Sequence, residues 1–258
     1  MLAERDLITS TRFGELDICF DATVLRPRSW TIAQSEWAAE VAADVEPGPL
    51  LELCSGVGHI GLVAASMTGR RLVQVDRSER ACSLAAANAT AAGIEPEIRN
   101  ADLRAALGRH ERYPLIIADP PYIPTLEVER HPEDPVTAID GGLDGMDLVR
   151  TCIDLTAIHL TAAGVTILQL ADRNQVAMVG ELASDAGLRV AEARQLRHDR
   201  ALIKLTAAGR DWTSAPVFTV QSPVSGHSIG TRTGEVDAAR WNDGSRRLLT
   251  RCAQLDIG

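Results

Sequence analysis

The chain has 258 residues, of which 45% are hydrophobic, and a formal net charge of -9. This length can bury a substantial core in one large domain or in a core domain with additions. No stretch approaches the roughly 18 apolar residues of a membrane span, and the N-terminus has no apolar signal core. The acidic balance disfavours nucleic acid as a partner unless a local basic patch holds it.

The cysteines are five in number, far apart, and form no cluster with zinc spacing. We therefore expect reduced thiols and a cytoplasmic protein without membrane contact. His131 and His159 have no partners at ligand spacing, so no metal is expected.

Strand and helix patterns alternate from about residue 49 to residue 206, which predicts successive βα units and a parallel sheet. Strands are expected at 49–54, 71–76, 95–100, 114–119, 164–170, 188–196 and 201–207. Helices are expected at 58–67, 78–93, 102–107, 145–161 and 174–186. The last two strands must pair antiparallel, because a parallel crossover needs about a dozen residues. The fold class is thus α/β: a Rossmann-like, mostly parallel sheet of seven strands with an antiparallel terminal hairpin and helices on both faces.

Three regions follow from this pattern: residues 1–48, 49–207 and 208–258. The first should hold a hairpin, because RFGELDICFDATVLRPR alternates, and then a helix that leads into the core. The second is the main domain. The third is a C-terminal extension with an arginine-rich candidate helix, and it is either a substrate cover, a homodimer arm or packing against the sheet edge.

A glycine-rich loop follows the first strand of the main domain. LELCSGVGHIG places Gly56, Gly58 and Gly61 at the spacing G-x-G-x-x-G, and Asp76 follows about 20 residues later. This pattern suits a dinucleotide, but any strand-to-helix turn that brings backbone N–H groups close to a nucleotide needs the same glycines. The loop therefore predicts a nucleotide-like ligand without choosing one.

Glu52, in the strand before the loop, favours a cationic ligand. A carboxylate there can accept hydrogen bonds from loop amides and lie near a positive charge. S-adenosylmethionine carries a sulfonium and an ammonium and has no pyrophosphate, so it fits better than NAD; bracing of the loop is the alternative role. Asp76 would take the ribose hydroxyls and Asp102 the adenine amino group, and each could instead cap a helix.

The sequence DPPY, Asp119 to Tyr122, closes an apolar strand at the edge of the sheet where ligands of open α/β folds bind. Methyl transfer to a planar NH2 group is slow because the nitrogen lone pair is delocalised. The Asp119 carboxylate and a main-chain carbonyl near Pro120 could hold both N–H groups and aim the nitrogen. Pro120 and Pro121 would stiffen the turn, and Tyr122 would offer a face to a flat acceptor.

Several motifs in order resemble the HemK-like protein-(glutamine-N5) methyltransferases, which modify the glutamine of the GGQ motif in peptide-chain release factors. VLRPRSWT is similar to that family's VLIPRPET, LLELCSGVGHIG to LDLGTGSGAI, and DPPYI to NPPYI. DPVTAIDGGLDGMDLVR is similar to EPxxALxGGxDGLxxxR, LQLADRNQ to LEIGxxQ, and RHDRALI to the final DRVV hairpin. The likeness extends over about residues 13–206.

The chain also departs from this family. Cys54 stands where the first loop glycine is usual, Gln169 replaces a glutamate, and Asp119 replaces asparagine. The last change resembles the DPPY of adenine N6 and guanine N2 methyltransferases. Only about 12 residues precede the first matching strand, so the family's helical N-terminal domain is expected to be missing and activity on release factors to be weak.

We therefore predict an S-adenosylmethionine-dependent N-methyltransferase acting on a planar amide or amine. A protein amide is the first acceptor, and a nucleobase or small molecule is the second. A non-catalytic S-adenosylmethionine-binding regulator is the alternative of another class. The predicted catalytic residues are Asp119, Pro120, Pro121 and Tyr122. The predicted cofactor residues are Glu52, Cys54, Ser55, Gly56, Gly58, Asp76, Asp102 and Asp119.

Overall fold

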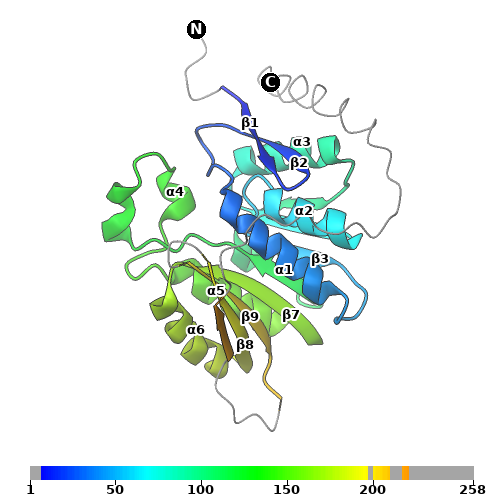
Figure 1. Ribbon diagram of the computed structural model, residues 1–258, viewed down its shortest axis with the longest axis vertical. Coiled ribbons are helices and arrows are strands. Elements are labelled where there is room, and N and C mark those ends of the chain that lie inside the picture. The colour runs from blue at the N-terminus through cyan, green and yellow to red at the C-terminus, as the bar shows by residue number, and fades with distance from the viewer. Residues whose placement is uncertain (1–6, 197–199, 210–216, 221–258) are drawn as a thin grey trace.

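The computed structural model describes residues 7–196, 200–209 and 217–220. A central sheet runs in the order β10-β8-β9-β7-β6-β3-β4-β5, with helices on both faces (Figure 1). Its middle strands, β3 (Leu50–Leu53) and β6 (Tyr113–Ala118), are buried at every position. Continuous burial is typical of parallel strands that are covered on both faces, and it explains the unbroken apolar runs in the sequence.

All seven predicted strands are present. β3 pairs parallel with β4 (Leu72–Asp76) and β6, β4 with β5 (Glu97–Asn100), and β6 with β7 (Leu160–Leu170). β9 (Ala201–Ala207) pairs antiparallel with both β7 and β8 (Leu188–Gln195). The predicted fold class and terminal hairpin are therefore confirmed.

The count of seven strands is one short. β10 (Val217–Val220) adds an eighth strand, parallel to β8 at the sheet edge. The prediction ended the sheet at the hairpin because the resemblance ended there. Apart from 208, 209 and β10, the predicted C-terminal extension lies outside the described residues, as does its arginine-rich segment.

Two hydrophobic cores lie on opposite faces of the sheet. One contains side chains from α1 (Ile32–Ala42), α2 (His59–Thr68) and α3 (Glu79–Ala92). The other contains side chains from α5 (Asp147–His159) and α6 (Arg173–Asp185). Neighbouring strand residues alternate between the cores, Leu50 in the first and Leu51 in the second, as side chains of period two must.

The N-terminal hairpin is confirmed as β1 (Thr9–Phe13) and β2 (Leu16–Phe20), and the predicted lead-in helix is α1. Buried Asn88 of α3 joins the hairpin to the glycine loop. Its side chain accepts from the N–H of Cys19 and donates to the carbonyls of Cys19 and Val57. The hairpin is thereby held beside the glycine loop.

A lobe between β6 and α5 was not predicted as structure. It contains a 3-10 helix, η4 (Thr125–Arg130), and the short α4 (Val136–Ile139), and it projects from the sheet edge in green in Figure 1. Its base is tied down where Ile123 and Asp140 form a parallel bridge. Two further 3-10 helices occur, η2 (Ser29–Thr31) and η3 (Leu103–Ala105). Among the described helices none is long and apolar enough to cross a membrane.

Candidate active site

The glycine loop turns sharply between β3 and α2, and Cys54 adopts a conformation that favours glycine. Its φ is 57°, the single positive value at a described non-glycine residue. Gly56 and Gly58 follow with φ of 52° and 81°. The chain thus keeps the backbone of a glycine loop although a cysteine stands first. A hydrogen bond with Cys152 and burial raise the pKa of the Cys54 thiol. Cys19, Cys54, Cys82 and Cys152 are free thiols, and Cys252 lies outside the described residues.

Glu52 braces the glycine loop from inside the sheet. Its carboxylate accepts from the Gly61 N–H at 2.8 Å and from Gln74 Nε2 at 2.7 Å, and the side chain is buried. Burial raises the pKa of Glu52 to about 8, against the effect of these two hydrogen bonds. The structure gives Glu52 the bracing role that the sequence left open.

Asp76 lies at the end of β4 and holds two loops together. One carboxylate oxygen accepts from the Gly56 N–H and the other from the Ser78 N–H, both at 2.8 Å. The helix-capping alternative for Asp76 is wrong, because Ser78 is the N-cap of α3. Asp102 does cap a helix, accepting from the Arg104 N–H at the start of η3.

A cavity of about 490 Å³ opens beside these loops. Six of the eight predicted cofactor residues line it, and Glu52 and Gly58 do not. A Cβ on Gly58 would lie 2.6 Å from Gln74 Nε2, so this glycine serves close packing behind the loop. The six are Cys54, Ser55, Gly56, Asp76, Asp102 and Asp119.

The charges of this cavity fit a cation. Five aspartates line it against two arginines, Arg77 and Arg104. Such a lining would repel the pyrophosphate of a dinucleotide and attract a sulfonium or an ammonium. The Asp76 carboxylate lies at the cavity wall between the glycine loop and the start of α3, where it can accept hydrogen bonds from ribose hydroxyls. The residues present therefore fit S-adenosylmethionine.

The DPPY turn is held from three sides. Gln175 of α6 donates to the Tyr122 carbonyl at 2.9 Å, and the Gly141 N–H donates to the Ile123 carbonyl at 2.8 Å. A Cβ on Gly145 would lie 2.4 Å from the Tyr122 carbonyl oxygen, and one on Gly141 would lie 2.8 Å from that of Pro121. The GGLDG segment needs glycines because the turn packs directly on its backbone.

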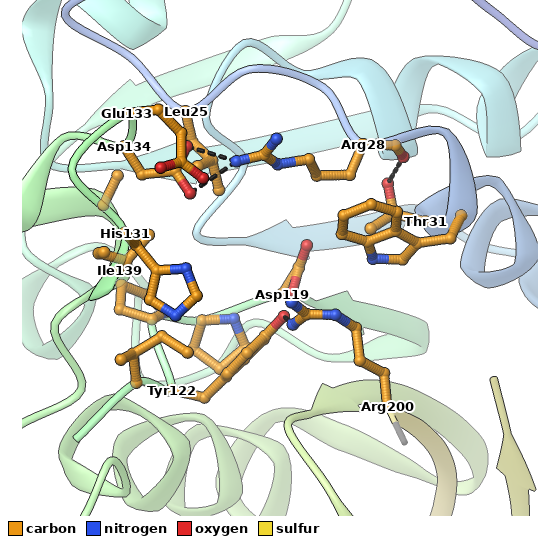
Figure 2. Close-up of a pocket in the computed structure, with 15 residues that line it drawn as sticks. Leu25, Arg28, Thr31, Asp119, Tyr122, His131, Glu133, Asp134, Ile139 and Arg200 are labelled. Carbon is orange, nitrogen blue, oxygen red and sulfur yellow. Dashed lines mark hydrogen bonds and ion pairs between the residues drawn. The ribbon is translucent and has the colours of Figure 1, made fainter. Parts of the chain in front are cut away.

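A second cavity of about 150 Å³ lies on the other side of the turn, and Figure 2 shows its lining. All four residues of DPPY line it. Leu25, Asp119, Pro121 and Ala138 line both cavities, so Asp119 lies where the two meet and is the ionisable residue that they share. The remaining lining comes from distant parts of the chain: the segment before α1, the lobe and the start of β9.

Asp119 offers this cavity a buried carboxylate that is free to accept a hydrogen bond. Burial raises its pKa to about 7, against the positive charge of Arg200. Within the described chain its carboxylate has no hydrogen-bond donor, and the Pro120 carbonyl likewise accepts no hydrogen bond. Burial also raises the pKa of Tyr122, with the charge of Asp119 acting in the same direction. Tyr122 is thus a neutral hydroxyl at ordinary pH.

The sequence analysis assigned only the DPPY residues to this cavity, and Arg28, Trp30 and Arg200 are among the lining residues that it missed. Arg28 donates to both oxygens of Asp134, one at 2.6 Å, and joins the segment before α1 to the lobe. The Arg200 guanidinium packs over the rings of Trp30 and Tyr122, with centroid distances of 5.0 and 5.5 Å. The VLRPRSWT and RHDRALI motifs contained these residues, but their spacing could not show that they meet.

His131, Glu133 and Asp134 in this cavity bring candidate ligand atoms within 4.8 Å of one another. The expectation that His131 has no partner at ligand spacing is therefore wrong. Asp134 is already paired with Arg28, whose positive charge disfavours a cation there. That the protein binds no metal remains a prediction.

Solved structures share this fold. The catalytic domain of hMettl16, in complex with the MAT2A 3′UTR hairpin 1, has a TM-score of 0.62 and 14% identity, covering 80% of this chain and 78% of that one. A SAM-dependent methyltransferase from Agrobacterium tumefaciens has a TM-score of 0.58 and 17% identity, covering 81% and 72%. The methyltransferase small domain model matches residues 38–131. Fold and site define the class of S-adenosylmethionine-dependent, Rossmann-like methyltransferases.

Curated relatives identify the family within this class of methyltransferases. The release factor glutamine methyltransferase of Mycolicibacterium smegmatis is 30% identical over 196 residues, 73% of this chain and 68% of that protein. That of Deinococcus radiodurans is 30% identical over 185 residues, 68% and 64%. The ribosomal protein uL3 glutamine methyltransferase of Bradyrhizobium diazoefficiens is 35% identical over 128 residues, 47% and 40%. The chain belongs to the HemK-like protein-(glutamine-N5) methyltransferase family. It spans slightly less than two thirds of the length of the Deinococcus relative.

Proposed function

We propose that the protein is an S-adenosylmethionine-dependent N-methyltransferase that modifies a side-chain amide of a protein. The observation that carries this proposal is the meeting of the two cavities at Asp119. The larger cavity suits the cationic cofactor and the smaller one suits a planar acceptor. We assign residues 49–207 to the methyltransferase domain, preceded by the hairpin and α1 and followed by the C-terminal extension.

The Asp119 carboxylate and the Pro120 carbonyl would each accept one N–H of the acceptor's NH2 group. Bound S-adenosylmethionine supplies an electrophilic methyl group on its sulfonium. Holding both N–H groups fixes the plane of the acceptor and aims its nitrogen at the methyl carbon. The acceptor nitrogen, held by Asp119 and Pro120, would form its new bond to the methyl carbon, and S-adenosylhomocysteine would leave as the neutral product. The nitrogen, now more acidic, then releases one proton to solvent.

A protein acceptor is favoured over a nucleic acid by the charge around the second cavity. Seven acidic residues lie between Glu127 and Asp147, against Arg130 alone. This stretch forms the lobe beside the cavity, and its charge would repel a phosphate backbone. Curated relatives are named for methylating a release factor or ribosomal protein uL3. A nucleobase or a small molecule is the second candidate, because DPPY resembles the motif of base methyltransferases.

The proposal is tested by incubating cell extract with purified protein and S-adenosylmethionine carrying an isotopic methyl label. We expect the label in protein, and none above background with Asp119→Ala. Label in RNA, DNA or small molecules would contradict the protein acceptor. Failure of the wild-type protein to bind S-adenosylhomocysteine in calorimetry would contradict the enzyme assignment itself.

A further inference from the structure

We propose that Arg200 recognises the carbonyl oxygen of a primary carboxamide whose NH2 group is held by Asp119. This inference rests on the proposed function and narrows its acceptor to one functional group. Arg200 is then a specificity-determining residue of the second cavity. Arg200 immediately precedes β9, so it reaches the cavity from a different part of the chain than the DPPY turn.

Arg200 is held rigidly in the cavity wall. Its guanidinium lies 5.0 Å from the ring centroid of Trp30 and 5.5 Å from that of Tyr122, and its Nη1 donates to the Tyr122 hydroxyl. These contacts restrict the orientation of the guanidinium. Figure 2 shows the head group directed into the same space as the Asp119 carboxylate. Its orientation therefore does not depend on a ligand.

Arg200 has donor capacity to spare. A guanidinium offers five N–H groups, and one of its nitrogens, Nη1, is used in the described part of the chain. No described carboxylate lies within ion-pair distance of Arg200, whereas Arg28 in the same cavity is bound to Asp134. Its charge acts on Asp119 and lowers the pKa of that carboxyl. A ligand with a hydrogen-bond acceptor facing Arg200 and a hydrogen-bond donor facing Asp119 would satisfy both residues.

A primary carboxamide has this arrangement on one carbon. Its NH2 can donate to Asp119 while its oxygen accepts from Arg200. A carboxylate would face Asp119 with a like charge, and an ammonium or an amidinium would face Arg200 with a like charge. The cavity of about 150 Å³ resembles in volume one that holds benzene, which is ample for the end of a glutamine or asparagine side chain.

Three molecules of nearly equal shape test this pairing: propionamide, propionate and propionamidinium. Each is titrated by ligand-observed NMR into the protein saturated with S-adenosylhomocysteine. We expect the wild-type protein to prefer propionamide over both analogues. Arg200→Met should weaken propionamide binding roughly tenfold or more, because a charge-assisted hydrogen bond is lost. Arg200→Lys should retain part of it, and Arg200→Glu should switch the preference to propionamidinium.

S-adenosylhomocysteine affinity is the control, since Arg200 does not line the cofactor cavity. An unchanged affinity shows that each variant is folded. Equal propionamide binding by Arg200→Met and wild type would overturn the proposal, as would a wild-type protein without preference among the three molecules. In either case intact S-adenosylhomocysteine binding and methyl transfer would leave the proposed function standing.

Discussion

The two cavities that meet at Asp119 are built in different ways. The cofactor cavity contains the loops at the ends of neighbouring parallel strands, residues 54–60, 76–78 and 101–104, and is completed by residues 23–25 and 136–148. The acceptor cavity collects side chains from residues 25–31, 119–123, 131–139 and Arg200. The strand-end loops, whose backbone conformation is set locally, line the cofactor cavity alone, whereas Arg28, Trp30 and Arg200 line the acceptor cavity alone and meet through tertiary contacts. Cofactor binding and acceptor binding should therefore respond to different substitutions.

The largest effect is expected from Asp119→Ala. Loss of the acceptor-binding carboxylate should lower kcat by roughly a hundredfold or more. S-adenosylhomocysteine affinity should change little, because Asp76 and the glycine loop remain. Steady-state kinetics and calorimetry measure the two quantities. Normal turnover by this variant would show that acceptors bind elsewhere and would end the distinction between the cavities.

Asp76→Ala should produce the opposite pattern. Loss of the two charge-assisted hydrogen bonds that Asp76 would make to the ribose hydroxyls should weaken S-adenosylhomocysteine binding by about 1.5 to 3 kcal/mol. Asp102→Ala, at the exposed rim, is the matched variant and should weaken binding less. Calorimetry checks both. An affinity unchanged by Asp76→Ala would remove Asp76 from the cofactor site.

Gly145→Ala should disturb the DPPY turn, all four residues of which line the acceptor cavity. Its φ is 75° and a Cβ would lie 2.4 Å from the Tyr122 carbonyl oxygen, so the DPPY turn must shift. A misplaced acceptor should lower kcat/KM roughly tenfold. Gly180→Ala, on α6 with no atom within 4 Å of the added Cβ, is the control and should be fully active. Equal activity of the two variants would contradict the packing role of the GGLDG segment.

The raised pKa of Asp119 predicts a pH effect. Below a pH of about 7 the Asp119 carboxyl is protonated and keeps one carbonyl oxygen as an acceptor, as an asparagine would. Activity should thus fall, as the pH decreases through about 7, only to the level of Asp119→Asn, and a bound sulfonium should move the midpoint lower. Asp119→Asn should keep substantial activity if orientation is the main role, and it should lose this acidic limb.

The same shift has a consequence for stability. The folded-state pKa of Asp119 lies above its ordinary value of 3.8, so the folded protein binds the proton more tightly than the unfolded chain. The associated stability is present below pH 3.8 and is lost as the pH rises to about 7. Asp119→Asn should remove this dependence, which denaturant unfolding at several pH values would detect.

The smallest effects are expected at Cys54. Cys54→Gly should leave cofactor affinity within a few-fold, because glycine adopts a φ of 57° freely. Cys54→Val should destabilise the protein by about 1 to 2 kcal/mol, since a β-branched residue is strained in this region. Denaturant unfolding distinguishes the two variants. Equal stability would show that the loop adjusts its backbone instead.

Much of the fold could be predicted from the sequence because its signals are local. Apolar runs marked β3 and β6, and the short link after Gln195 required an antiparallel pair. Strand β10 carried no comparable signal, and it follows a segment where the resemblance had ended. The lobe with η4 and α4 was missed because its helices are too short for a periodic pattern.

The candidate site divides in the same way. Asp76, Asp119 and Gly56, which line the cofactor cavity, could be identified from the sequence because each follows a strand or forms a turn, whereas Gly58 packs behind the loop. Glu52 was placed toward the ligand, and the structure shows it bonded to Gly61 and Gln74. These hydrogen bonds depend on which way the Glu52 side chain points from its strand, which the sequence pattern alone does not determine. Arg200 could not be assigned, because its contacts with Trp30 and Tyr122 span 170 and 78 positions of the chain.

The central claim is that the protein methylates a side-chain amide nitrogen. The most direct test locates the labelled methyl group by tandem mass spectrometry of protein modified in the extract experiment. We predict a methyl group on the side-chain nitrogen of a glutamine or an asparagine, and its loss with Asp119→Ala. A methyl group on lysine, arginine or a carboxylate, with Asp119→Ala as active as wild type, would contradict the account.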